Sequence, residues 1–204
     1  MRAREVNLYP NDPLFPGLLD SGLPAGFAYK PDVISRSEEA VLVAQLEALP
    51  FEPFEFHGYL GNRRVVSYGH RYDYTKRSLQ GSDPLPDWLT PLRCTAAEFL
   101  GVSADKFLQA LVTEYAPGAG IGWHRDKPMF EHVIAFSFQS PCVLRFRRSK
   151  EEGWFRSKLL VEPRSVYRLS GEARELWQHS IAPMNRLRYS VTFRNFRAGI
   201  SILA

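Results

Sequence analysis

Cysteine is scarce in this chain of 204 residues, which holds only Cys94 and Cys142. Two thiols cannot build the network of cross-links on which small secreted proteins depend. Both lie among apolar residues, so we expect two buried thiols in a reducing compartment. A chain of this length also buries enough surface to fold without a disulfide or a structural metal.

Long apolar segments are absent too. No run approaches the roughly 18 residues that a membrane-spanning helix needs, and residues 1–15 lack the apolar centre of a secretory signal. We therefore expect a cytoplasmic protein without membrane contact. Because repeats, low-complexity segments and an interdomain linker are also missing, the sequence predicts one domain.

Positive charge exceeds negative charge only slightly. The formal net charge is +4 and the isoelectric point is near 9.1. Basic residues crowd the stretch 145–158, which includes Arg148. This pattern favours nucleic-acid contact, and a solvated hairpin face explains it equally well.

The first half of the chain carries the signals of two helices. Ser35 and Glu38 have the spacing of a capping box, and the apolar residues behind them predict a helix that ends near Pro50. A second helix is predicted over 86–100, with Gly101 just past its end.

The rest of the chain is predicted to form strands. Residues 54–59 and 63–68 have the composition of two strands separated by a turn at 60–62. From residue 107 on, short apolar and β-branched segments alternate with turn residues, which favours a sandwich, barrel or jelly roll with the helices against one side. The strands predicted there are 108–115, 132–139, 143–148, 154–161, 166–169 and 187–196.

Two histidines and an aspartate suggest a metal site. His124 and Asp126 are two residues apart, so their side chains project from one face of an extended chain. His179 follows 55 residues later. Two histidines with one carboxylate leave three positions of an octahedral Fe(II) open. A core histidine and a polar strand end are the alternatives at this point.

The last predicted strand alternates polar and apolar side chains. Arg188, Ser190 and Arg194 fall on one face, which lines a cavity if the strand belongs to a barrel and faces solvent otherwise. A guanidinium pairs with a carboxylate through two parallel hydrogen bonds, so two arginines along one strand suit a dicarboxylic acid. Thr113 and Tyr115 share one face of another predicted strand.

Together these residues resemble the AlkB-like Fe(II)/2-oxoglutarate dioxygenases. The resemblance extends from Leu108 to Arg197, and it lies in the order and spacing of four motifs. These are Glu114-Tyr115-Ala116-Pro117-Gly118-Ala119, His124-x-Asp126, His179, and Arg188-x-Ser190-x-Thr192-Phe193-Arg194. The resemblance implies that His124, Asp126 and His179 bind iron.

The resemblance also implies a site for 2-oxoglutarate. Arg188 would bind the distal carboxylate with help from Tyr115 and Ser190, and Arg194, with Thr113 nearby, would hold the metal-chelating end. With Fe(II), 2-oxoglutarate and O2, such enzymes hydroxylate a C–H bond and release succinate and CO2. When the bond belongs to an N-methyl group, the hydroxymethyl product collapses to formaldehyde and a free nitrogen.

The family fold is a double-stranded β-helix, or jelly roll. It implies an α+β, mostly β, fold that N-terminal helices buttress. We expect residues 106–198 to form the jelly-roll core. Residues 1–105 would supply the helices and a substrate lid within the same domain, and 199–204 a short tail.

The sequence departs from the nucleic-acid demethylases of this family at one position. They carry an acidic residue four positions after the first iron ligand, where this chain has Pro128. Glu131 follows three residues later and is the candidate substitute. This departure weakens the inference to DNA repair in particular.

A lid that stacks an aromatic side chain on the substrate base is also expected. The segment 63–74 is the candidate, because it is rich in tyrosine and arginine. A half-buried strand whose tyrosines pack on the core is the alternative. The candidate substrate-binding residues, with one from the basic hairpin, are Tyr68, Arg71, Tyr72, Tyr74 and Arg148.

Three functions follow from these observations. The first is oxidative demethylation or hydroxylation of an alkylated base in single-stranded DNA or RNA, by a monomer. The second is the same chemistry on a protein or a small molecule. The third is a jelly-roll binding module without activity.

Overall fold

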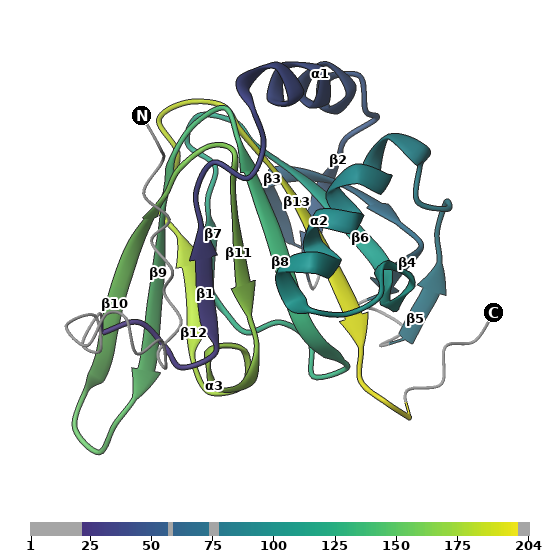
Figure 1. The fold of residues 1–204 in the computed structure, drawn as a ribbon. Coiled ribbons are helices and arrows are strands. Elements are labelled where there is room, and N and C mark those ends of the chain that lie inside the picture. Colours follow the sequence, from purple (N-terminus) through teal and green to yellow (C-terminus); the bar gives the residue numbers. More distant parts are fainter. Residues whose placement is uncertain (1–21, 57–58, 74–77, 200–204) are drawn as a thin grey trace, which may run out of the picture.

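A computed structural model describes residues 22–56, 59–73 and 78–199. Two antiparallel sheets form its body (Figure 1). The larger sheet has the strand order β1-β11-β8-β13-β6-β3-β2, and the smaller has the order β10-β9-β12-β7. The strands of the larger sheet are β1 (Phe27–Lys30), β2 (Glu52–Phe56), β3 (Tyr59–Tyr68), β6 (Phe107–Tyr115), β8 (Phe130–Phe138), β11 (Ser165–Leu169) and β13 (Arg188–Phe196). Those of the smaller are β7 (Ile121–His124), β9 (Cys142–Ser149), β10 (Trp154–Val161) and β12 (Gln178–Ile181).

Two helices cover the outer face of the larger sheet (Figure 1). They are α1 (Arg36–Glu47) and α2 (Thr90–Leu100), and a short helix α3 (Gly171–Glu175) precedes β12. Leu46 of α1 and Leu92 of α2 belong to one buried cluster with Val191 and Phe193 of β13. The prediction that helices buttress one side of the strands is therefore confirmed.

The predicted start of α1 and the predicted end of α2 are correct. Ser35 and Glu38 form the expected capping box, with the Glu38 amide donating to Ser35 Oγ and the Ser35 amide to Glu38 Oε2. Gly101 ends α2 in a left-handed conformation, as a C-terminal glycine does. One 3-10 turn, Asp87–Leu89, replaces the first turn of the predicted second helix.

The predicted turn at 60–62 is wrong. β3 begins at Tyr59, so these residues lie within a strand that pairs with β2. Gly61 fits there because the β2 backbone is close: a Cβ on Gly61 would lie 3.3 Å from the carbonyl oxygen of Phe54. A glycine within a strand often marks such a close approach, and here it imitates a turn signal.

The six strands predicted after residue 107 all exist, each within two residues of its expected limits. The sequence did not predict β1, β7, β12 or the small sheet of β4 (His70–Asp73) and β5 (Ser78–Gly81). These segments have four residues each, which is too short for a recognisable alternation.

A second buried cluster joins the two sheets. Leu144 and Phe146 of the smaller sheet pack with Val133 and Ala135 of the larger one. The inner faces of the two sheets thus share a core at one end, which leaves polar inward-facing residues at the other.

Within the described ranges, no helix is long and apolar enough to cross a membrane.

We predict that the Leu46→Ala substitution lowers the free energy of unfolding by about 2–5 kcal/mol. Leu46 is fully buried between α1 and the larger sheet, and its loss would leave a cavity. Val41→Ala, on the exposed face of the same helix at 65% exposure, is the control and should change stability by less than about 0.5 kcal/mol. Urea unfolding followed by circular dichroism measures both, and equal losses would contradict the packing of α1.

Candidate metal and 2-oxoglutarate site

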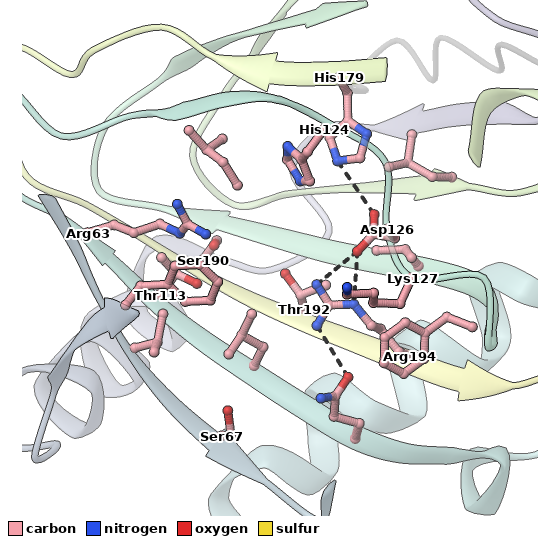
Figure 2. Close-up of a pocket in the computed structure, with 18 of the residues that line it drawn as sticks. Arg63, Ser67, Thr113, His124, Asp126, Lys127, His179, Ser190, Thr192 and Arg194 are labelled. Carbon is pink, nitrogen blue, oxygen red and sulfur yellow. Dashed lines mark hydrogen bonds and ion pairs between the residues drawn. The ribbon is translucent and has the colours of Figure 1, made fainter. Parts of the chain in front are cut away.

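Two histidines that are far apart in the chain meet across neighbouring strands. β12 pairs with β7 so that His179 lies directly opposite His124, and their ring centroids are 4.2 Å apart. Residues opposite each other on antiparallel strands point to the same face of a sheet. Both rings therefore project from the smaller sheet toward the larger one (Figure 2).

Asp126 completes this group just beyond the end of β7. Its Oδ2 lies 3.5 Å from Nε2 of His179, and the ligand atoms of His124, Asp126 and His179 all lie within 4.8 Å of one another. Oδ2 is buried and has no hydrogen-bond partner among the described residues. A buried carboxylate oxygen without a donor is unfavourable, and a metal cation would satisfy it.

The protonation states of the three residues suit a metal. Nδ1 of His124 lies 2.9 Å from the carbonyl oxygen of Gly122, which only accepts, so Nδ1 carries the proton and Nε2 is left as the ligand. Burial, with the nearby His124, lowers the pKa of His179 to about 3. Burial raises the pKa of Asp126, but the charge and hydrogen bonds of Arg194, with the adjacent imidazoles, outweigh it and lower that pKa to about 2. Neutral imidazoles and an ionised carboxylate are the forms that bind metals.

Arg194 holds the other oxygen of Asp126. Its Nε and Nη2 donate to Oδ1 of Asp126 at 3.2 and 3.1 Å, and its Nη1 donates to Oε1 of Gln109 at 3.3 Å (Figure 2). Gln109 Nε2 in turn donates to the carbonyl oxygen of His70 at 2.8 Å. Arg194 is thus a positioning residue for Asp126, a role that sequence reasoning did not foresee.

Arg188 is the largest fully buried side chain of the described residues. Its Nε donates to Oγ of Ser137 at 3.0 Å, whereas Nη1 and Nη2 have no hydrogen-bond partner among those residues. The ring of Tyr115 lies 4.9 Å from its Cζ, and no described carboxylate pairs with it. Because a buried charge without a counter-ion is costly, these two parallel donors indicate a site for a carboxylate anion.

Thr113 lies beside Ser190 and not beside Arg194. The β13–β6 register places Ser190 opposite Thr113 and Arg194 opposite Gln109. Each strand residue adds about 3.3 Å, so Thr113 is about 13 Å along β6 from Gln109. Ser190 and Thr113 are buried and line the cavity together (Figure 2). The expectation that Thr113 supports Arg194 is therefore corrected.

The three candidate metal ligands line one cavity of about 1590 Å³. Tyr115 and Ser190 line it too, whereas the fully buried Arg188 is not a lining residue and lies against the ring of Tyr115. Sites for small molecules usually measure about 300–1,000 Å³, so this cavity has room for more than a cofactor. Arg63 lines it with its guanidinium 3.8 Å from the ring centroid of Phe54. The structure thus places the candidate metal ligands on the wall of a large open volume, with the buried Arg188 behind the lining residue Tyr115.

Two of the candidate substrate residues, Tyr68 and Arg148, lie away from this cavity. Tyr68 points to the opposite face of β3 from the cavity-lining Ser67 and packs in the core under the helices, so it cannot stack on a base there. Arg148 donates to Glu172 at 3.0 Å and does not line the cavity. Arg71 and Tyr72 lie in β4, and Tyr74 lies outside the described residues. That these three residues form part of a substrate lid stays a prediction.

Glu131 does not occupy the place of the missing acid. Pro128 lines the cavity, whereas Glu131 accepts a hydrogen bond from Asn195 Nδ2 at 3.1 Å and is not among the lining residues. Acidic groups line other parts of the wall, among them Asp83 and Glu175.

Sequence reasoning missed the residues that support the site. Ser137 is a polar residue between two buried phenylalanines of β8, and Gln109 is a buried polar residue in the largely apolar β6. A polar side chain at an inward-facing position of an apolar strand is the signal that would have identified both.

Two histidines and one carboxylate with open positions are typical of non-haem iron(II) oxygenases. The chain belongs to the 2OG-Fe(II) oxygenase superfamily, because the model of that family matches residues 28–195. The family uses Fe(II), 2-oxoglutarate and O2, which confirms the predicted cofactors.

Individual relatives support an AlkB-like member of this superfamily. An alkylated DNA repair protein ALKBH8 homolog from Arabidopsis thaliana is 30% identical over 196 residues, covering 84% of this chain and 55% of its own length. A probable RNA/DNA demethylase ALKBH6 from Danio rerio is 29% identical, covering 75% of this chain and 68% of its own length. The tRNA (carboxymethyluridine(34)-5-O)-methyltransferase ALKBH8 from Mus musculus is 29% identical, but the match covers only 25% of that protein. The chain thus spans about half, or less, of the first two ALKBH8 relatives.

A solved structure resembles the fold as a whole. OsALKBH1 superposes with a TM-score of 0.62 at 15% identity, over 83% of this chain and 96% of that one. The predicted AlkB-like jelly roll is confirmed by this likeness.

We predict that His179→Ala lowers the affinity for Fe(II) about a hundredfold or more, because it removes one of three closely spaced ligand groups. Anaerobic titration with Fe(II) and 2-oxoglutarate, followed by the weak visible absorption of the complex, measures the loss. His132→Ala, at a histidine outside the cavity lining, is the control and should keep the absorption. Retention of the absorption in His179→Ala would remove His179 from the ligand set.

We predict that Arg188→Met raises the KM for 2-oxoglutarate about a hundredfold without lowering the thermal midpoint of the ligand-free protein. The substitution removes two donors for a carboxylate and also a buried charge that has no counter-ion. Arg186→Met, at an exposed position two residues earlier, should change neither quantity. An unchanged KM in Arg188→Met would place the cosubstrate elsewhere.

Proposed function

We propose that this chain is an iron(II)- and 2-oxoglutarate-dependent dioxygenase that oxidatively demethylates alkylated bases of single-stranded DNA or RNA. The observation that carries the proposal is the presence of two unsatisfied buried groups at one cavity, Asp126 on its wall and Arg188 against the wall residue Tyr115. Oδ2 of Asp126 has no donor, and the terminal nitrogens of Arg188 have no acceptor. A cation at the first and a carboxylate at the second would satisfy both.

The site residues divide into two groups in this proposal. His124, Asp126 and His179 would hold the iron, with Asp126 fixed by Arg194. Arg188, with Ser190 and Tyr115, would bind the distal carboxylate of 2-oxoglutarate. Bound iron, with 2-oxoglutarate and O2, would supply the oxidant that hydroxylates a substrate C–H bond, with succinate and CO2 as co-products. An N-hydroxymethyl product would then release formaldehyde and leave an N–H group.

Two observations support a nucleic-acid substrate. The cavity is larger than a cofactor needs, so a base turned out of its strand has room to enter. The names of several relatives refer to DNA repair, to RNA/DNA demethylation or to tRNA. Both favour a substrate base that enters the cavity while the rest of the nucleic-acid strand stays outside.

One observation favours the second candidate function, which is the same oxidation of a protein or a small molecule. Pro128 stands where nucleic-acid demethylases carry an acid, and Glu131 lies outside the cavity lining. The test must therefore compare classes of substrate.

We predict that single-stranded oligonucleotides with 1-methyladenine or 3-methylcytosine accelerate succinate release at least about tenfold above the background without substrate. Formaldehyde should appear in an amount equal to the succinate released above that background, because each demethylation releases one molecule of each. The unmodified oligonucleotides are the matched control, and His124→Ala should abolish the reaction.

Background turnover of 2-oxoglutarate that no methylated oligonucleotide accelerates would contradict the proposal in favour of a protein or small-molecule substrate. Nucleic-acid binding without any turnover of 2-oxoglutarate, unchanged in His124→Ala and Arg188→Ala, would indicate a binding module.

A further inference from the structure

The smaller sheet carries an unusual balance of charge. Its four strands contain five basic residues and no acidic one. The whole chain has a formal net charge of +4, so the rest of the chain has a net charge of −1. The positive charge of this protein is therefore concentrated on one sheet. The basic residues are Arg145, Arg147, Arg148, Arg156 and Lys158.

Most of this charge lies on the outer face of the sheet. Leu144 and Phe146 are fully buried, so the alternating Arg145 and Arg147 point outward. The β9–β10 register places Arg156 opposite Arg147 and Lys158 opposite Arg145. Four cationic side chains thus form a block on β9 and β10. These two strands lie at the far side of the molecule from α2 (Figure 1).

Tryptophans alternate with these cations. The Cζ of Arg147 lies 4.5 Å from the ring centroid of Trp123 and 4.4 Å from that of Trp154. The Cζ of Arg145 lies 5.2 Å from the centroid of Trp123. Cation–π contacts of this kind hold the rings and guanidinium groups in place but do not neutralise the positive charge.

The hydrogen-bond partners of the outer-face arginines are neutral. Arg147 Nε donates to Oε1 of Gln178 at 2.7 Å, and Arg145 Nε donates to Oγ of Ser180 at 3.0 Å. Arg156 and Lys158 are exposed, and within the described ranges neither forms an ion pair. The outer face therefore offers fixed aromatic rings and charge that no carboxylate of the described chain neutralises.

This face adjoins the wall of the cavity. β7 is the edge strand of the smaller sheet, and Trp123 of β7 also lines the cavity. From β7 the face crosses β12 and β9 to β10, which is three strand spacings or about 14 Å. A strand that leaves the cavity beside Trp123 would run directly onto the cationic block.

We infer that the outer face of the smaller sheet, formed by Trp123, Arg145, Arg147, Trp154, Arg156 and Lys158, binds single-stranded nucleic acid next to the target base. This inference rests on the proposed function. Cations between aromatic rings match a polymer in which phosphates alternate with flat bases. Phosphate contacts fix position without reading sequence, so the face supplies affinity and register and leaves recognition of the modification to the cavity.

The test uses binding of the full chain to a fluorescein-labelled 12-nucleotide RNA of uridine, measured by anisotropy between 50 and 300 mM salt. Arg156→Gln with Lys158→Gln should weaken binding about five- to tenfold at low salt. The slope of log affinity against log salt should fall by about 1.4, because each lost phosphate contact removes about 0.7. Lys30→Gln with Arg36→Gln, two exposed cations outside the smaller sheet, removes the same charge and should change affinity less than twofold.

Two neighbouring aromatic residues test the stacking surface. Trp154 and Phe155 are 40% and 48% exposed and point to opposite faces of β10. Trp154→Ala should weaken binding about fivefold or more, since stacking on a base contributes about 1–3 kcal/mol. Phe155→Ala should leave binding within twofold.

Equal weakening by the two double variants would overturn the inference, because net charge alone would then explain binding. Binding to phosphatidylserine vesicles that is lost in Arg156→Gln with Lys158→Gln, while RNA binding is kept, would overturn it in favour of a membrane surface. The same measurements distinguish failure of this inference from failure of the proposed function. Selective loss of RNA binding, with no methylated oligonucleotide accelerating succinate release, would keep the surface and reject demethylation. Accelerated release with RNA binding unchanged in every variant would keep demethylation and reject the surface.

Discussion

The pairing of β12 with β7 is the interaction on which the site depends. Because this pairing sets His179 directly opposite His124, two side chains from distant parts of the chain point to one place without any loop closing around them. Asp126 follows the same strand and is drawn into the group by Arg194 from the opposite sheet. A shift of this register by one residue would turn one histidine to the outer face.

β13 links the site to the stability of the whole molecule. Its outward-facing Tyr189, Val191 and Phe193 lie in the core beneath the helices, and its inward-facing Arg188 and Ser190 face the site. The apolar face therefore fixes the register of the polar one. Holding the Arg188 guanidinium in the interior without a counter-ion is costly, and the packing of the same strand offsets that cost.

The sequence was informative where a signal was local or alternated over several residues. The capping box of Ser35 and Glu38, the C-terminal Gly101 and the alternation from Arg188 to Arg194 were all predicted and all exist. It was misleading where a short-range signal had a distant cause. Gly61 resembled a turn, but it lies within β3 because the backbone of the neighbouring strand is close. Tyr68 resembled a stacking residue, but the alternation of β3 turns it into the core.

By itself, the sequence determined the residue types of the site, their order and the jelly-roll family, because these are encoded in spacing and alternation along the chain. Only the tertiary structure decided which of these residues are neighbours. In the structure, Thr113 lies beside Ser190, Arg194 donates hydrogen bonds to Asp126, and Arg188 donates one to Ser137. The cations of β9 and β10 lie together on one outer face. The physical reason is that cross-strand register is set by packing between segments that lie far apart in sequence, and no local pattern records it.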